Sequence, residues 1–310
     1  MVERALRVAS LLLALAAMAL ALGLVQGGWT TGAVLALLTA LALSLHGAPL
    51  AIEFITGALI DRRPGPRLSP LAALRLWWGE TSAQFRVFML DQPWRNGFAE
   101  PAPVHDPRRP AVLLIHGYLC NRAVWRRWLR PLAADTNVAT LSLEPPLGSI
   151  SDYAASIARA VASLRAASGA ERVILVGHSM GGLAAREYLR VHGGEAVSRL
   201  VTIATPHDGT VFAPFGLGRN AREMVRGSRF LTRLAAQPCP VPVVCLATRD
   251  DNLVVPRRST VLEGAQALWF EGIGHLALTQ SPQVLAALRA QLIAPKLPER
   301  VDPAAPVALP

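Results

Sequence analysis

The stretch Arg172-Val-Ile-Leu-Val-Gly-His-Ser-Met-Gly-Gly182 decides the fold class. Its aliphatic first half predicts a buried strand, and a helical pattern follows over 180–191. Between the two lies Gly177-His-Ser-Met-Gly181, which fits the pattern G-x-S-x-G. This pattern holds a serine on a tight strand-to-helix turn, where the flanking glycines allow close backbone packing. The helix N-terminus adds partial positive charge. Ser179 is therefore the candidate nucleophile.

The same alternation of apolar runs and helical patterns continues on both sides of this turn. Strands are expected at 111–115, 138–143, 172–177, 200–204, 241–247 and 267–270, with helices at 121–134, 152–167, 180–191 and 282–293. Strands that are apolar without alternation, interleaved with helices, predict a parallel sheet covered on both faces. Ligands bind such sheets at the carboxyl ends of the strands.

A serine at neutral pH needs a general base, and the base needs an orienting acid. In this architecture the acid and the histidine follow the serine at later strand ends. His275, in Gly272-Ile-Gly-His275, follows the last strand and is the expected base. The turn after the preceding strand carries two aspartates. Asp251, at the start of Asp-Asn-Leu-Val-Val-Pro256, is the expected acid, and Asp250 is the alternative.

These motifs together resemble the α/β-hydrolase superfamily, and within it the bacterial lipases and esterases. The resemblance covers roughly residues 110–293 and rests on five stretches: Leu114-Ile-His-Gly-Tyr118, Gly177-His-Ser-Met-Gly-Gly182, Thr205-Pro-His-Asp-Gly-Thr210, Asp251-Asn-Leu-Val-Val-Pro256 and Gly274-His275. It implies a mostly parallel sheet with a cap insertion, and an oxyanion hole made of two backbone N–H groups. Met180 is expected to supply one donor and Tyr118 the other, with Leu119 as the alternative to Tyr118.

The resemblance also implies a cap at 208–237, inserted between the strands at 200–204 and 241–247. Its apolar side chains are expected to meet an acyl chain, unless the cap packs only on its own body; they are Phe212, Pro214, Phe215, Met224, Phe230 and Leu231. The expected substrate-contacting residues are Gly117, Leu119, Phe212 and Phe215. His207 matches a lipase-like pattern, and loop support is the role expected for it.

The first sixty residues differ from the rest in composition. They contain only Glu3, Arg4, Arg7 and Glu53 as charged residues. An apolar stretch at 8–25 is long enough to span a bilayer, and a second stretch runs over 33–52 after a short loop. We therefore expect a transmembrane hairpin anchor at 1–60.

Charge around the hairpin predicts its orientation. Arg4 and Arg7 precede the first span, Arg62, Arg63 and Arg67 follow the second, and the loop between has no charge. By the positive-inside rule both ends face the cytoplasm, which predicts a catalytic domain on the cytoplasmic side of a bacterial inner membrane. The alternative is a cleaved signal peptide and an exported enzyme.

The remaining segments carry weaker signals. Residues 61–109 are expected to be a linker and an embellishment packed on the main domain 110–295, and residues 296–310 a Pro/Ala-rich tail. The basic, Trp-bearing segment 121–130 predicts an amphipathic helix or a contact with the membrane surface. Three cysteines without metal-site spacing indicate no metal. The 31 basic residues against 21 acidic ones are dispersed, so no nucleic-acid partner is expected.

The sequence thus predicts a membrane-anchored serine ester hydrolase that cleaves carboxylic esters, lipids included, through an acyl-enzyme and without a cofactor. An acyltransferase that uses the same triad is one alternative. A non-catalytic hydrolase-fold binding protein is the other. The oligomeric state is not predicted.

Overall fold

The body of the protein is built on a six-stranded parallel sheet. The computed structural model describes residues 1–61 and 68–293, so the expected tail and the arginines at 62, 63 and 67 lie outside the described residues. The strand order is β2-β1-β3-β4-β5-β6 and every pairing is parallel. The strands are β1 (Ala111–Ile115), β2 (Asn137–Leu141), β3 (Val173–His178), β4 (Val197–Ile203), β5 (Val243–Thr248) and β6 (Gln266–Phe270). The expected strands and their parallel sheet are confirmed, with ends that differ from the expected ones by at most three residues.

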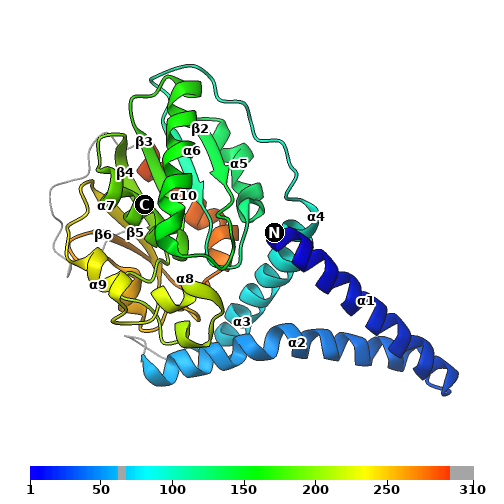
Figure 1. Cartoon of the computed structure of the whole chain (residues 1–310). Coiled ribbons are helices and arrows are strands. Elements are labelled where there is room, and N and C mark those ends of the chain that lie inside the picture. The colour runs from blue at the N-terminus through cyan, green and yellow to red at the C-terminus, as the bar shows by residue number, and fades with distance from the viewer. Residues whose placement is uncertain (62–67, 294–310) are drawn as a thin grey trace.

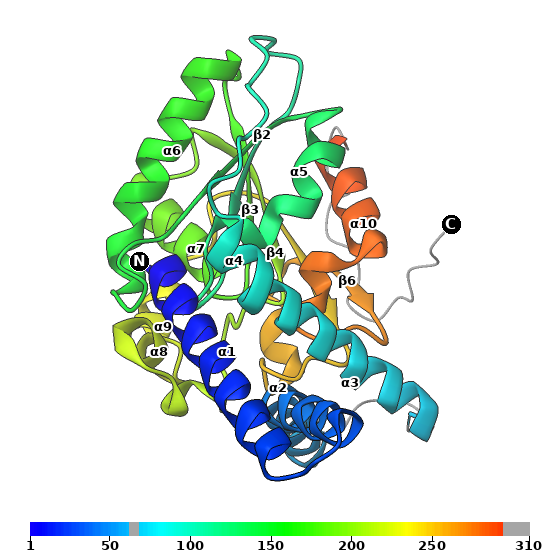
Figure 2. The ribbon, with the colours of Figure 1, turned by 90° about the vertical axis from the view of Figure 1, so that its right-hand side faces the viewer.

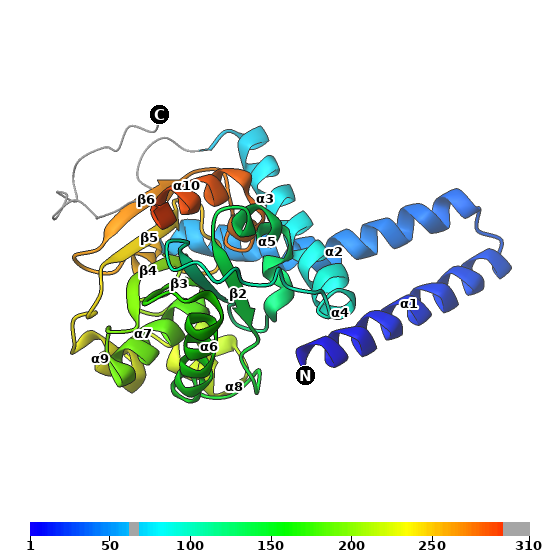
Figure 3. The same cartoon turned by 90° about the horizontal axis from the view of Figure 1, so that it is seen from above.

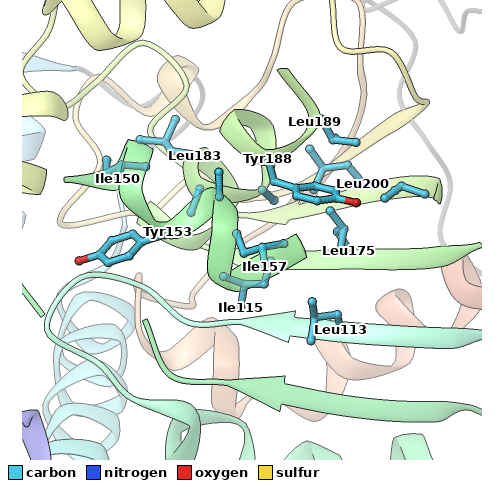
Figure 4. Packing of buried hydrophobic residues seen from close by; sticks show 14 of the residues in the cluster. Leu113, Ile115, Ile150, Tyr153, Ile157, Leu175, Leu183, Tyr188, Leu189 and Leu200 are labelled. Atoms are coloured by element: carbon cyan, nitrogen blue, oxygen red, sulfur yellow. The ribbon is translucent and has the colours of Figure 1, made fainter. Parts of the chain in front are cut away.

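Helices cover both faces of this sheet (Figures 1 and 2). One face packs against α6 (Tyr153–Ser168) and α7 (Met180–His192), and the other against α5 (Arg126–Ala133) and α10 (Pro282–Ile293). Successive residues of β1 point into opposite clusters, which is why the strand is apolar throughout. Figure 4 shows Leu113, Leu175 and Leu200 from three strands packed against the helices of the first face.

The strand order reverses next to β1, which pairs with β2 on one side and β3 on the other. In open α/β sheets a crevice for ligands forms at such a reversal, outside the carboxyl ends of the strands. The chain that leaves β1 begins with His116, and the chain that leaves β3 begins with Ser179. The topology therefore brings the two sequence motifs to one place.

The expected cap forms three short helices between β4 and β5: η4 (Ala213–Phe215), α8 (Gly218–Glu223) and α9 (Arg229–Ala235). The expectation that all its apolar groups meet an acyl chain is wrong for three of them. Met224, Phe230 and Leu231 are buried in the core cluster that includes α7, because they lie on the inner side of the cap. Phe215 is 84% exposed.

The N-terminal segment forms two long helices, α1 (Val2–Gln26) and α2 (Thr31–Ile60). Both are long and apolar enough to cross a membrane. The connected ends of the two helices project from the body, whereas the C-terminal part of α2 lies against it (Figures 1 and 3). The N-terminal end of α1 contacts the body, since Arg7 Nε donates to Pro93 O and Asn96 Nδ2 to Glu3 Oε2. Both helices are longer than the expected spans.

The segment after α2 packs on the body, where an embellishment is expected. It consists of α3 (Pro70–Phe85), the π-helix η1 (Arg86–Asp91) and α4 (Gln92–Trp94). Ser69 caps α3 by accepting a hydrogen bond from Ala72 N, and Pro70 occupies the first helical position. Val87 is fully buried in the second core cluster. This segment is therefore part of the same core as the sheet.

Candidate active site

Ser179 lies on the strained turn between β3 and α7. Its backbone has φ 53° and ψ −125°, a conformation that costs a non-glycine residue energy. The turn is held because Ser179 N donates to Ile203 O at 2.8 Å and Gly182 N donates to Ser179 O at 3.0 Å. The side chain is buried at 6% exposure. A strained serine at a helix N-terminus is the geometry expected of a nucleophile elbow.

The glycines of the G-x-S-x-G motif are required by close packing. A Cβ atom at Gly177 would lie 2.5 Å from the backbone of Gly182, and one at Gly181 would lie 2.4 Å from Ile115 O. Real Cβ atoms essentially never approach backbone so closely. The two glycines thus allow the start of α7 to pack closely against the end of β3 and against the end of β1.

His275 and Asp251 form a buried pair at the ends of β6 and β5. Nδ1 of His275 lies 3.0 Å from Oδ2 and 3.1 Å from Oδ1 of Asp251. Asp251 Oδ1 also accepts hydrogen bonds from Leu253 N and Val254 N, so its own turn holds the carboxylate. Burial lowers the pKa of His275, but the charge of Asp251, its hydrogen bond and the charges of Glu80 and Glu53 together outweigh burial and raise the pKa above the ordinary value.

The second ring nitrogen of His275, Nε2, is not used in the contact with Asp251. Nε2 is buried and has no hydrogen-bond partner within the described part of the chain. The residue before Ser179 contacts the same imidazole, since the rings of His178 and His275 lie 4.8 Å apart and His178 Nε2 lies 3.2 Å from His275 O. Burial lowers the pKa of His178 well below its ordinary value, so this neighbouring ring is neutral.

Asp250 points elsewhere. Its Oδ2 accepts a hydrogen bond of 2.6 Å from Gly272 N, on the loop that follows β6. Asp250 thus joins the ends of β5 and β6, whereas Asp251 is the aspartate in contact with His275.

The loop after β1 approaches Ser179 closely. A Cβ at Gly117 would lie 3.0 Å from Ser179 Cβ, so only glycine fits there without a shift. His116 supports this loop through both ring nitrogens. Nδ1 lies 2.9 Å from Gly117 O, and Nε2 accepts a hydrogen bond from Leu143 N. Burial lowers the pKa of His116 to about 4, which suits this neutral, bridging role. Leu119 adopts φ 54° at the far side of the loop.

Tyr118 links this loop to the cap. Its hydroxyl donates to Leu217 O at 2.7 Å and accepts from Leu217 N at 2.8 Å. Met180 follows Ser179 directly as the first residue of α7. Phe212 is half-buried beside the cap helices, and Phe215 faces solvent.

His207 and the basic segment 121–130 occupy supporting positions. His207 is buried beneath the cap, where Nε2 lies 3.2 Å from Thr202 Oγ1 and Nδ1 lies 3.3 Å from Arg186 Nη1. In the basic segment Trp125 and Trp128 are buried in the core. Arg122 pairs with Glu100 and Arg126 with Asp91.

Three residues that sequence reasoning did not assign to the site hold the loop of His275. Asn252 Oδ1 accepts from His275 N at 3.0 Å, and Asn252 Nδ2 donates to Glu53 Oε2 of α2 at 2.7 Å. Glu80 of α3 accepts from Leu276 N at 2.8 Å and Ala277 N at 2.9 Å. A polar residue on an otherwise apolar helix is the signal that could have found Glu53. Residues 1–61 and 68–293 contain no cluster of three or more His, Cys, Asp or Glu side chains suited to a metal ion.

Comparison with known proteins agrees with this fold. The family model of the alpha/beta hydrolase fold matches residues 110–226. A pimeloyl-[acyl-carrier protein] methyl ester esterase of Vibrio atlanticus is 35% identical over 96 residues, which are 31% of this chain and 36% of that protein. A triacylglycerol lipase of Pseudarthrobacter phenanthrenivorans is 46% identical over 55 residues, 18% of this chain and 17% of that protein. The matched segments thus span only about a third or less of these relatives.

Solved structures extend the likeness over more of the chain. The mature form of the Bacillus licheniformis lipase BlEst2 has a TM-score of 0.56 at 18% identity, covering 62% of this chain and 96% of that chain. Aspergillus fumigatus lipase B has a TM-score of 0.52 at 16% identity, covering 79% of this chain and 66% of that chain. At these identities the likeness concerns the fold.

The parallel sheet, the turn that carries Ser179 and the family match identify the class of protein. The chain has the α/β-hydrolase fold, and residues 110–226 match the family model of that fold. Its fold is similar to that of solved lipases, and two apolar helices precede the hydrolase domain.

Proposed function

We propose that the protein is a serine ester hydrolase in which Ser179, His275 and Asp251 form the catalytic triad. The observation that carries the proposal is the buried Asp251–His275 pair, whose free Nε2 belongs to an imidazole in contact with the nucleophile turn. An orienting acid on Nδ1 and an unoccupied Nε2 are what a general base for a serine requires.

The reaction proceeds in two halves. Nε2 of His275 takes the proton of Ser179 Oγ as this oxygen attacks the ester carbonyl, and Asp251 stabilises the imidazolium. Backbone N–H groups of Met180 and of the loop at Tyr118 stabilise the oxyanion. The imidazolium then protonates the leaving alkoxide, and an acyl-enzyme remains. Water, deprotonated by His275, attacks the acyl-enzyme and releases the carboxylic acid and the free serine.

The substrate that suits this site is a carboxylic ester with an apolar acyl part. The cap carries Phe212 and Phe215, and it is joined to the loop at Tyr118 by the two hydrogen bonds of the tyrosine hydroxyl to Leu217. Gly117 and Leu119 belong to the same loop and are proposed to contact the substrate. The similar proteins described above, a methyl ester esterase and a triacylglycerol lipase, support this class of substrate.

The N-terminal helices are proposed to anchor the enzyme in a membrane, with the body on the cytoplasmic side. Both ends of the hairpin contact the body, through the N-terminal end of α1 and the C-terminal end of α2. This arrangement favours a hairpin whose two ends emerge on one side of the bilayer, over a first helix that is cleaved. A reporter that functions only in the periplasm, fused to the C-terminus, tests this placement. Activity of that reporter would contradict a body on the cytoplasmic side.

The full-length chain, purified in detergent, tests the activity. We expect hydrolysis of p-nitrophenyl esters and covalent labelling by a fluorophosphonate probe. Comparing acyl lengths from acetate to palmitate separates a short-chain esterase from a lipase. A new ester formed when an alcohol acceptor is added would instead indicate an acyltransferase, and absence of both labelling and turnover would contradict the proposal.

A further inference from the structure

The loop that carries His275 is held by a side chain from outside the hydrolase domain. The backbone from Gly274 to Ala277 wraps around the carboxylate of Glu80, which is fully buried and comes from α3, ahead of the domain. A Cβ at Gly274 would lie 2.5 Å from Glu80 Oε2. Glycine at 274 therefore permits the carboxylate to lie against the loop on both sides of His275.

A second carboxylate reaches the same loop from α2. Glu53 accepts from Asn252, and Asn252 in turn accepts from the backbone N–H of His275. Farther along α2, Gly57 O accepts from Arg257 Nη1, so α2 also contacts the loop that follows Asp251. Separate contacts thus run from α2 and from α3 to the loops that carry His275 and Asp251.

The two helices are themselves docked tightly. Trp77 Nε1 of α3 donates to Gly47 O of α2 at 2.7 Å. A Cβ at Gly47 would lie 2.3 Å from the Trp77 ring, so glycine is what lets the ring sit against the helix. A shift of α2 is therefore passed on to α3 and to Glu80.

We propose that Glu80 and Glu53 are positioning residues for His275, so that the two helices preceding the hydrolase domain complete its active site. The inference rests on the proposed triad. It adds that the membrane-proximal helices hold the general base in register with Ser179, in addition to anchoring the protein. The charged or titratable groups facing His275 are then Asp251, Glu80, Glu53 and the neutral ring of His178.

Electrostatics gives this arrangement a measurable signature. Burial raises the pKa of Glu80 to about 7, against two backbone hydrogen bonds and the charge of His275 that lower it. The negative charge of Glu80 in turn raises the pKa of His275. Removing that charge should therefore lower the pH at which the enzyme loses activity, which a purely structural role would not do.

The experiment uses the full chain in detergent and measures ester hydrolysis, the pH profile of kcat/KM and the rate of fluorophosphonate labelling. Glu80→Gln should move the acid limb to lower pH and reduce kcat with KM little changed. Glu80→Ala should reduce kcat by about ten- to a hundredfold, the scale of a misplaced catalytic group. Glu53→Gln can still accept from Asn252 and should keep kcat near that of the wild type, with a small shift of the acid limb to lower pH, whereas Glu53→Ala should reduce kcat.

Controls separate the possible failures. Arg75→Gln, an exposed position on α3, should leave every measurement unchanged. If wild type is labelled at Ser179 but Glu80→Gln lowers only the melting temperature, with kcat and the acid limb unmoved, the positioning role is wrong while the hydrolase stands. If wild type is neither labelled nor active, the proposed function itself fails.

Discussion

Nδ1 of His275 lies 3.0 Å from Oδ2 of Asp251, although the two residues stand on the loops of different strands. Both side chains are almost completely removed from solvent, and Asp251 is held by two further backbone donors. A buried imidazole beside a fixed carboxylate is a preorganised base, because little has to move when the proton arrives. The predictions below test this pair and the structure around it.

Ser179→Ala should abolish fluorophosphonate labelling and lower kcat by about 10⁴-fold or more, because no other hydroxyl occupies the nucleophile turn. Turnover of p-nitrophenyl esters and gel fluorescence of the labelled protein provide the two readouts. Ser198→Ala, an exposed serine on β4, is the matched control and should behave as wild type. Labelling that persists in Ser179→Ala contradicts the assignment of the nucleophile.

Replacement of the two neighbouring aspartates should have very different effects on kcat. Asp251→Asn should lower kcat by about 10⁴-fold, since an amide no longer selects the productive tautomer of the histidine. Asp250→Asn weakens the bond to Gly272 N and should mainly reduce the melting temperature, with kcat within about tenfold of wild type. Steady-state kinetics and thermal unfolding of both variants decide the matter, and a reversed order of the kcat values would sink the assignment.

Activity should rise with pH through a value above 6.5 and then level off. Only the neutral imidazole can accept the serine proton, and Asp251 raises the pKa of His275 although burial opposes it. The profile of kcat/KM against pH for a soluble ester measures this limb. A limb below pH 6.5 in the wild-type enzyme would show that the carboxylates do not stabilise the imidazolium as described.

Gly181→Ala and Gly79→Ala should act in opposite directions. At Gly181 the new methyl group meets Ile115 O at 2.4 Å, so we expect a loss of stability of several kcal/mol and of activity. At Gly79, within α3, nothing lies within 4 Å of the new atom, and alanine should stabilise by up to about 1 kcal/mol. Denaturant or thermal unfolding of both variants compares them, and equal effects would contradict the close approach of α7 to β1.

Glu80 should make folding stability depend on pH in a defined window. The folded protein binds the Glu80 proton with a pKa of about 7, whereas the ordinary value is 4.5. Between these values the folded state holds more protons than the unfolded chain, so stability falls as pH rises, by up to about 3 kcal/mol. Glu80→Gln does not titrate and should lack this loss. A difference between the two proteins that stays constant from pH 4.5 to 8 would contradict it.

Much of the fold could be predicted because its signals are local. Each strand is a short apolar run buried on both faces, and each helix has its own periodicity, so both can be read from neighbouring residues. The G-x-S-x-G turn is also local, because its glycines contact backbone only a few residues away or on the adjoining strand. Ends of elements shifted by a few residues, since capping and packing decide them.

Other features depend on contacts between distant segments. Sequence pattern left two aspartates as candidates for the acid, and only the tertiary structure shows that Asp251 contacts His275 while Asp250 turns to Gly272. The sequence left open whether the apolar residues of the cap meet an acyl chain or pack on the body, and the structure buries Phe230 and Leu231 beside α7. Apolar residues look alike in sequence whether they meet a ligand or the core.

The sequence by itself determined the class of protein, the nucleophile turn, the histidine after the last strand and two apolar helices ahead of the domain. Tertiary structure alone decided that α2 and the following helix α3 reach the candidate active site. Glu80 bonds to a residue 196 positions later, and Glu53 to one 199 positions later. No local pattern records such pairs, because a buried carboxylate is stable only where folding brings distant backbone or amide donors to it.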